Sequence, residues 1–208
     1  MSPPVLPPAP RLGAGAACAA LALLASLPSP GSAGAQELHV DRTAERSVRF
    51  VSQAPLEDFD GVTEGLDGFV LLPGGLRVGP VASESRIYLE VDLASIDTGI
   101  SLRNRHMRDN YLHTDRFPYA TYSAEVTRVE EPSPGSYVVS ASGILSIHGV
   151  DRERTLECQT RDTTPPHRVR CTFTVLLSDH DVEIPRLMFM KVADQVELHL
   201  AFVLAEPR

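Results

Sequence analysis

The chain has 208 residues, of which 43% are hydrophobic and 22% are charged, and its formal net charge is -8. This composition is typical of a globular domain, and it excludes a disordered acidic chain and a protein of many membrane spans. The negative charge also argues against nucleic acid as a partner, because phosphate groups repel an acidic surface.

The first 35 residues have the pattern of an export signal. Arg11 precedes an apolar run over residues 12–27, a Pro-Ser-Pro-Gly break follows, and an Ala-Gly-Ala cleavage site ends at Ala35. A short membrane anchor is the alternative, but the run is shorter than the roughly 20 residues of a spanning helix. We predict cleavage after Ala35, a periplasmic or secreted location, and a mature domain of residues 36–208 with formal charge -9 and no transmembrane segment, since residues 1–35 contain Arg11 and no acidic residue.

Beyond residue 36 the dominant pattern is an alternation of apolar and polar residues, which is typical of half-buried strands. Two stretches, residues 100–110 and 179–193, break the alternation and are each interpreted as a short helix or a capping loop. About eight or nine strands in one domain predict an all-β antiparallel fold, either a sandwich or a closed up-and-down barrel with one or two short helices. Strands are expected near residues 48–54, 61–72, 87–93, 120–129, 137–147, 155–159, 169–175 and 196–204.

Two cysteines follow the predicted export signal, Cys158 and Cys171. They are placed symmetrically about the turn-forming residues 162–166, so in an antiparallel hairpin they would lie opposite one another, within disulfide range. An oxidising compartment favours the bond. The alternative is a pair of buried thiols on the apolar face of the hairpin.

Small residues recur on the faces of two neighbouring predicted strands, where a packed core would need bulk. In a barrel of about eight strands such residues leave room for one elongated guest, whereas large residues opposite them would fill the interior. Both outcomes are compatible with the sequence. The candidate cavity wall consists of Tyr122, Val139, Ala141, Leu145, Phe173, Leu198 and Phe202.

Residues 103–116 differ from the rest of the chain because they carry four arginines against two aspartates. Beside an apolar cavity, this basic segment would suit a guest with an apolar tail and an anionic or polar head. A solvated helix face that pairs with nearby acids is the alternative. The candidate mouth residues are Arg103, His106, Met107, Arg108 and Tyr111.

Signals for catalysis or metal binding are weak. Asp97-Thr98-Gly99 resembles an aspartic protease loop, but such an enzyme needs two copies, and the triplet is also an ordinary strand end. The seven histidines lack metal-ligand spacing, and His39, His167 and His199 fall at turn or solvent-facing positions. We therefore expect no enzyme, no metal and no cofactor, apart from a bound lipid.

A series of motifs, in order, resembles the YceI-like family. Its signature region is similar to residues 95–99 (SIDTG), 104–109 (NRHMRD) and 117–122 (FPYATY), and its later hairpin to residues 145–150 (LSIHGV) with Thr155-Leu156. Residues 192–196 (VADQV) resemble its approach to the final strand. Asn104 and Arg105 depart from the family, where many members carry an acidic residue and alanine, and residues 48–56 lack its frequent Lys-His pair.

The resemblance implies a lipocalin-like antiparallel β-barrel, exported in bacteria, that holds a polyisoprenoid chain without catalysis. The guest would be an isoprenoid quinone or a prenyl-phosphate-like lipid. The resulting hypothesis is a non-catalytic exported protein that holds or shuttles such a lipid. A stress-related or protein-interaction barrel with a filled core is the alternative, and the sequence leaves the oligomeric state open, a homodimer included.

Overall fold

The computed structural model describes residues 35–52, 59–81, 84–184, 186–187, 190–191 and 193–207, with side chains omitted at residues 35, 186–187 and 190–191. The predicted export signal lies outside these residues, apart from Ala35. Residues 53–54 at the end of one predicted strand and Met188-Phe189 of the second irregular stretch also lie outside them. The description that follows concerns the unit Ala33–Arg208.

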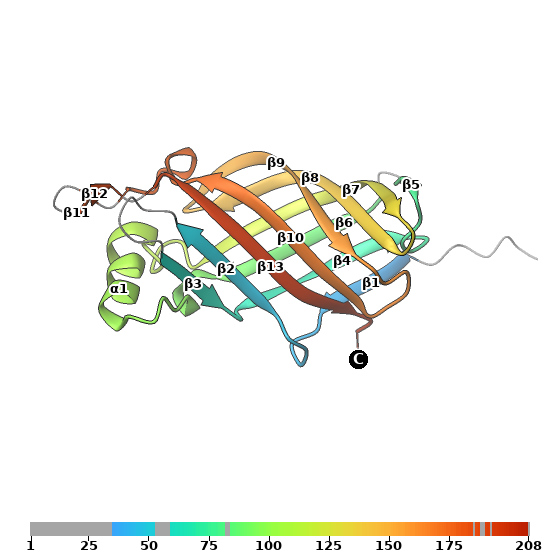
Figure 1. The fold of residues 1–208 in the computed structure, drawn as a ribbon, viewed down its shortest axis with the longest axis horizontal. Helices are drawn as coiled ribbons and strands as arrows, with labels where there is room; N and C mark the ends of the chain where they lie inside the picture. The colour runs from blue at the N-terminus through green and yellow to red at the C-terminus, as the bar shows by residue number, and fades with distance from the viewer. Residues whose placement is uncertain are drawn as a thin grey trace, which may run out of the picture. The chain divides into compact units, whose positions relative to one another are not determined.

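Eight antiparallel strands of the described chain close into a barrel (Figure 1). Closure occurs where the first strand pairs with the last, with His39 opposite Ala205. The predicted all-β barrel is therefore confirmed, and the sandwich is excluded. In ring order the strands are β1 (Ala35–Val40), β4 (Leu66–Pro73), β6 (Arg86–Asp92), β7 (Tyr119–Ser133), β8 (Ser136–Ile147), β9 (Val150–Thr160), β10 (His167–Leu176) and β13 (Gln195–Ala205).

The remaining strands extend this ring. β2 (Ser47–Ser52) pairs with β13 and with β3 (Phe59–Thr63), β5 (Gly79–Pro80) pairs with β7, and β11 (Arg186–Leu187) pairs with β12 (Met190–Lys191). The strand predicted over residues 61–72 is in fact two, β3 and β4. The chain turns at Gly65, whose carbonyl accepts the Asp92 N–H at 2.8 Å, so that β4 continues beside β6.

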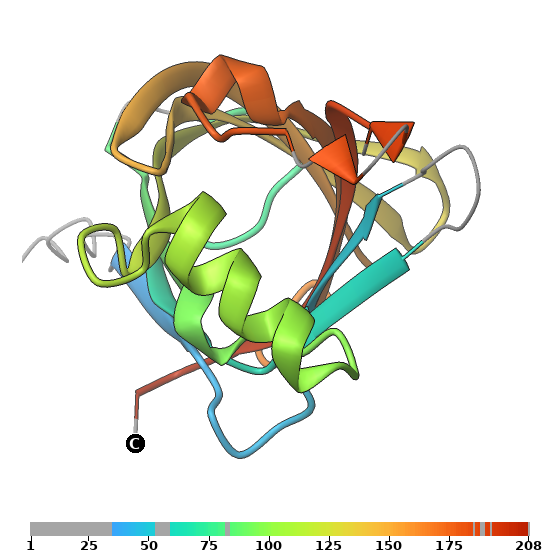
Figure 2. The same ribbon diagram turned by 90° about the vertical axis from the view of Figure 1, so that its left-hand side faces the viewer.

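One end of the barrel is covered by a helical segment (Figure 2). The short turn η1 (Leu93–Ser95) leads into α1 (Ser101–His106), which continues as the wider π-helical turn η2 (Met107–Leu112). A further turn, η3 (Leu177–His180), follows β10. Of the two irregular stretches, residues 100–110 are helical, while the second begins in η3 and leads to β11 and β12.

The hairpin of β9 and β10 holds a disulfide. Cys158 and Cys171 are directly opposite one another in the register, with Cα atoms 4.3 Å apart, and they are bonded. The predicted bridge is therefore present, in place of two free thiols.

Candidate functional site

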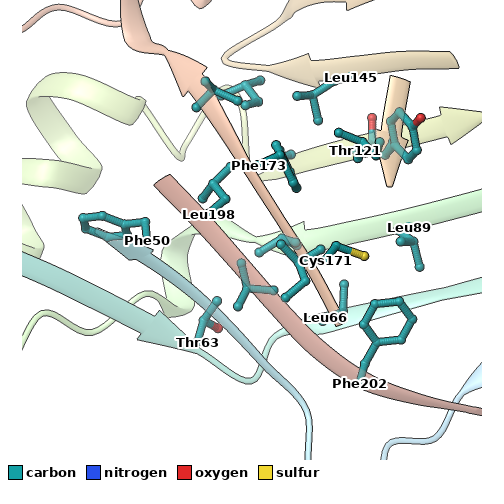
Figure 3. Close-up of a pocket in the computed structure, with 18 of the residues that line it drawn as sticks. Phe50, Thr63, Leu66, Leu89, Thr121, Leu145, Cys171, Phe173, Leu198 and Phe202 are labelled. Carbon is teal, nitrogen blue, oxygen red and sulfur yellow. The ribbon is translucent and has the colours of Figure 1, made fainter. Parts of the chain in front are cut away.

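The inward-facing side chains of the barrel enclose a cavity of about 830 Å³ (Figure 3). Leucine, valine, isoleucine and phenylalanine from strands all around the ring form most of its lining. The volume falls within the range of small-molecule sites. The barrel is therefore not filled by its own side chains, which contradicts the filled-core alternative.

The seven residues predicted as cavity wall all line this cavity, and Figure 3 shows four of them around it, Leu145 on β8, Phe173 on β10, and Leu198 and Phe202 on β13. Alternation along each strand accounts for this, because every second side chain points inward. Ala141 leaves space at the centre of β8, where its strand neighbour opposite is Val126.

Gly143 contributes differently from the other small residues of β8. A Cβ atom there would clash with the Ser123 carbonyl oxygen and the Ala124 Cα, so glycine permits β7 and β8 to approach closely. Neither Ala124 nor Gly143 is among the residues that line the cavity. Their small size serves the packing of the two strands.

Tyr122 places a polar group in the apolar wall. Its hydroxyl donates to the carbonyl oxygens of Ala141 at 2.8 Å and Arg154 at 3.1 Å. Burial raises the pKa of Tyr122 to about 12, because the phenolate would be desolvated. The hydroxyl is thus hydrogen-bonded to the backbone of the barrel, and the ring presents its apolar face to the cavity.

Four of the five predicted mouth residues, Arg103, His106, Met107 and Tyr111, also line the cavity, and Arg108 does not. Arg108 donates to the Ala94 carbonyl oxygen at 3.3 Å, so it contacts η1. Ordinary helical spacing accounts for this, because Arg108 follows Met107 by one residue, roughly a quarter turn around the helix axis, and so lies off the face that Met107 and Tyr111 share.

Arg103 brings a fixed positive charge to the mouth. Its Nε donates to Thr98 Oγ1 at 2.8 Å, and its guanidinium carbon lies 5.2 Å from the centre of the Phe59 ring. These contacts hold the side chain between α1 and β3. Beside it, Ile100 and Leu102 are 52% and 58% exposed, which gives the mouth an apolar rim.

The Asp97-Thr98-Gly99 triplet anchors the helical segment. Asn104 Nδ2 donates to Asp97 Oδ1 at 2.7 Å, and the Asn104 side-chain oxygen accepts the Thr98 N–H at 2.9 Å. The Asn104 amide, together with the Gly99 N–H, lowers the pKa of Asp97. The triplet therefore has a structural role, and the described residues contain no group of three or more His, Cys, Asp or Glu that could hold a metal ion.

The fold and the sequence pattern agree on a family. The pattern of the YceI-like domain matches residues 40–204, from the end of β1 almost to the end of β13. The chain belongs to the YceI-like family. Among curated proteins, none matches it.

Several solved structures share the YceI-like barrel of this chain. BcnA of Burkholderia cenocepacia is 19% identical, with a TM-score of 0.63, over 79% of this chain and 98% of its own. A polyisoprenoid binding domain from Saccharophagus degradans, implicated in plant cell wall breakdown, is 16% identical, with a TM-score of 0.61, over 84% and 100%. The YCEI protein of Campylobacter jejuni is 14% identical, with a TM-score of 0.52, over 75% and 89%. At these identities the likeness shows the fold alone.

The histidine and glycine of the YceI-like motif, His148 and Gly149, form the turn between β8 and β9. His148 Nδ1 donates to the His180 carbonyl oxygen at 3.2 Å, so its Nε2 is free to accept from His113 Nδ1 at 2.9 Å. A Cβ on Gly149 would lie 2.5 Å from the Phe117 ring. The motif thus ties η2, β8 and η3 together at the mouth end.

Ser52 lines the cavity although the sequence pattern did not single it out. It is 1% exposed, and its hydroxyl is the buried side-chain atom that has no hydrogen-bond partner in the described structure. The alternation of Val48, Phe50 and Ser52 on β2 places all three inward and could have identified it.

His167 corrects a prediction. It was expected at a turn or solvent-facing position, but it is 4% exposed and lines the cavity as the first residue of β10. Thr160, the last residue of β9, also lines the cavity and is 5% exposed. The alternation that places Cys171 and Phe173 inward also places His167 inward. This pattern in the sequence could therefore have identified His167 as a lining residue.

No helix in the described part of the chain is long and apolar enough to span a membrane.

Proposed function

We propose that this protein is a non-catalytic binding protein that holds or shuttles a polyisoprenoid or similar amphiphilic lipid inside its barrel. The observation that carries the proposal is the cavity of about 830 Å³, whose lining is largely apolar and whose mouth bears Arg103. The fold shared with a polyisoprenoid binding domain from Saccharophagus degradans supports the same class of ligand.

The lining of the cavity indicates what each end of such a guest would contribute to binding. Burying an apolar chain contributes about 25 cal/mol per Å², so most of the affinity comes from the tail. A polar or anionic head at the mouth meets the Arg103 guanidinium and the His106 ring, which orient it. An isoprenoid quinone or a prenyl-phosphate-like lipid has this combination of a long tail and a polar head.

We further propose that the protein acts in the bacterial periplasm or outside the cell, after cleavage behind Ala35. β1 begins at Ala35, so this cleavage leaves the strand from Gln36 onward. The proposed role requires no metal and no cofactor besides the lipid. It also involves no nucleic acid, because the formal net charge is -8.

The proposal is tested by titrating lipid-free protein with two ligands that share a head group, a long-tailed ubiquinone and its tail-less analogue. We expect the long-tailed quinone to bind and the analogue to bind at least a thousandfold more weakly, because the tail supplies the buried apolar area. A long-chain prenyl phosphate in the same assay reports the preference for the head. Failure of both long-tailed ligands to bind would contradict the proposal and favour a protein-interaction role.

A further inference from the structure

Two polar side chains, Thr160 and His167, line the end of the cavity opposite α1. β10 runs from His167 at this end to Leu176 near the end covered by α1 (Figure 1). Both side chains are at least nine-tenths buried and both line the cavity. We call this end the floor of the cavity; besides these two side chains, its lining includes Gln159 and the apolar side chains of Leu38, Leu72 and Leu204.

The backbone of one residue, Asp162, holds both side chains in place. Its N–H donates to Thr160 Oγ1 at 3.2 Å, and its carbonyl oxygen accepts from His167 Nδ1 at 2.9 Å. The Asp162 carboxylate is engaged elsewhere, because it accepts the Arg168 N–H at 2.9 Å and lies 3.6 Å from the Arg168 guanidinium. The Asp162 carboxylate thus contacts Arg168, while the Asp162 backbone contacts His167 and Thr160.

These contacts determine which hydrogen-bond donors and acceptors of the two side chains remain available to a ligand. A carbonyl oxygen only accepts, so His167 Nδ1 carries the hydrogen, and Nε2 of the neutral ring is left as an acceptor. Thr160 Oγ1 accepts from Asp162, which leaves its own proton to donate. Among the described residues, His167 Nε2 and the Thr160 hydroxyl proton have no partner.

We propose that Thr160 and His167 form a polar subsite at the floor of the cavity that binds a hydroxyl group on the inner end of the guest. A hydroxyl can donate to His167 Nε2 and accept from Thr160 at once. A carbonyl can satisfy only the threonine, and a hydrocarbon end satisfies neither. This inference rests on the proposed function, since it concerns the same cavity, and it predicts tighter binding for those amphiphiles whose buried end carries a hydroxyl.

The length of the cavity suits a long-chain probe with a polar group at each end. The inward residues of β10 from His167 to Val175 cover about 26 Å of strand at ~3.3 Å per residue. A strand tilt of roughly 40° reduces this to about 20 Å along the barrel axis. ω-Hydroxyhexadecanoic acid has a comparable extended length, with a carboxylate for Arg103 and a hydroxyl for the floor.

The test compares ω-hydroxyhexadecanoic acid with hexadecanoic acid by calorimetric titration of the lipid-free protein. In the wild type we expect the hydroxy acid to bind at least as tightly as the plain acid. In Thr160→Val we expect the hydroxy acid to lose roughly tenfold in affinity while the plain acid changes little, because a buried hydroxyl then lacks a donor. Thr160→Ser should restore the wild-type preference, and Thr155→Val, on the outer face of β9, should leave it unchanged.

The outcomes separate this inference from the proposed function. If both acids bind the wild type but the hydroxy acid is tenfold weaker than the plain acid, the floor subsite is contradicted and the lipid cavity stands. The subsite is equally contradicted if Thr160→Val, with its disulfide and melting temperature intact, keeps the wild-type preference. If neither acid binds the wild type, the proposed function fails and the inference with it.

Discussion

Cys158 and Cys171 are bonded across β9 and β10, and both residues line the cavity. The bridge closes a loop with a sequence separation of 13, and within this loop lies Asp162, whose backbone holds Thr160 and His167. A covalent link at this point keeps the hairpin paired directly beside the floor. Stability and the shape of the binding site are therefore connected through one disulfide.

Replacing both cysteines with alanine should lower the free energy of unfolding by up to about 3 kcal/mol. Most of this loss comes from the larger conformational entropy of the unfolded chain once the short loop is open. Denaturant unfolding of the wild type and the double variant measures the difference. Peptide mapping without reduction provides the direct check: two alkylatable thiols in the exported protein would refute the bridge.

Ala141→Phe should abolish lipid binding while the barrel still folds. The new ring would occupy the centre of the cavity, where Ala141 is now small and buried. Overpacking costs about 1 to 3 kcal/mol, which a thermal melt would register as a lower but cooperative transition.

Two control variants accompany Ala141→Phe. Ser140→Phe places the same ring on the outer face of β8 and should leave lipid content unchanged. Arg108→Ala should reduce binding only modestly, because Arg108 contacts Ala94 and does not line the cavity. Wild-type lipid content in a folded Ala141→Phe protein would show that the guest does not use this face.

Tyr122→Phe should change how stability depends on alkaline pH. The pKa of Tyr122 in the folded protein is about 12, above the ordinary value of 10.0, so the unfolded chain loses its proton first. The stability linked to Tyr122 is fully present below pH 10 and is lost as the pH rises towards 12, by about 3 kcal/mol. The phenylalanine variant lacks this component of the decline.

At neutral pH the same variant should be about 1 to 2 kcal/mol less stable than the wild type, because the carbonyls of Ala141 and Arg154 lose their donor. Urea unfolding of both proteins across the alkaline range provides both values. Parallel curves with no pH-dependent convergence would mean that Tyr122 titrates normally.

Asn104→Ala should loosen the helical segment at the mouth. The Asn104 amide is the main cause of the lowered pKa of Asp97, so the pKa should rise towards its ordinary value in the variant. Because the pKa of Asp97 is lowered by folding, the ionised carboxylate stabilises the folded protein above the unfolded-state pKa. This stabilisation is lost as the pH falls through the folded-state pKa. NMR titration of Asp97 and hydrogen exchange of residues 101–112 test this, and an unchanged Asp97 titration would contradict it.

The strand pattern allowed much of the barrel wall to be predicted. Alternation places Tyr122, Ala141 and Leu145 on one face regardless of the details of the loops, because the period of a strand is two. The symmetric placement of the two cysteines about their turn likewise allowed the register of the hairpin of β9 and β10 to be predicted.

Other features depend on contacts that a sequence pattern does not encode. Arg108 donates to the Ala94 carbonyl oxygen, and the sequence pattern does not reveal this contact between η2 and η1. His167 looked like a turn residue because it follows two prolines, yet its ring points inward and is held by the Asp162 carbonyl. Its role depends on a loop geometry formed only in the folded chain.

The most direct test of a lipid inside this barrel is native mass spectrometry of the protein purified without detergent from its own periplasm. We expect a folded species heavier than the polypeptide starting at Gln36 by the mass of one lipid. Denaturation should release this lipid, and fragmentation should identify it as a polyisoprenoid or a related amphiphile. A folded protein with the bare polypeptide mass, from which solvent extraction recovers no lipid, would contradict the proposed function.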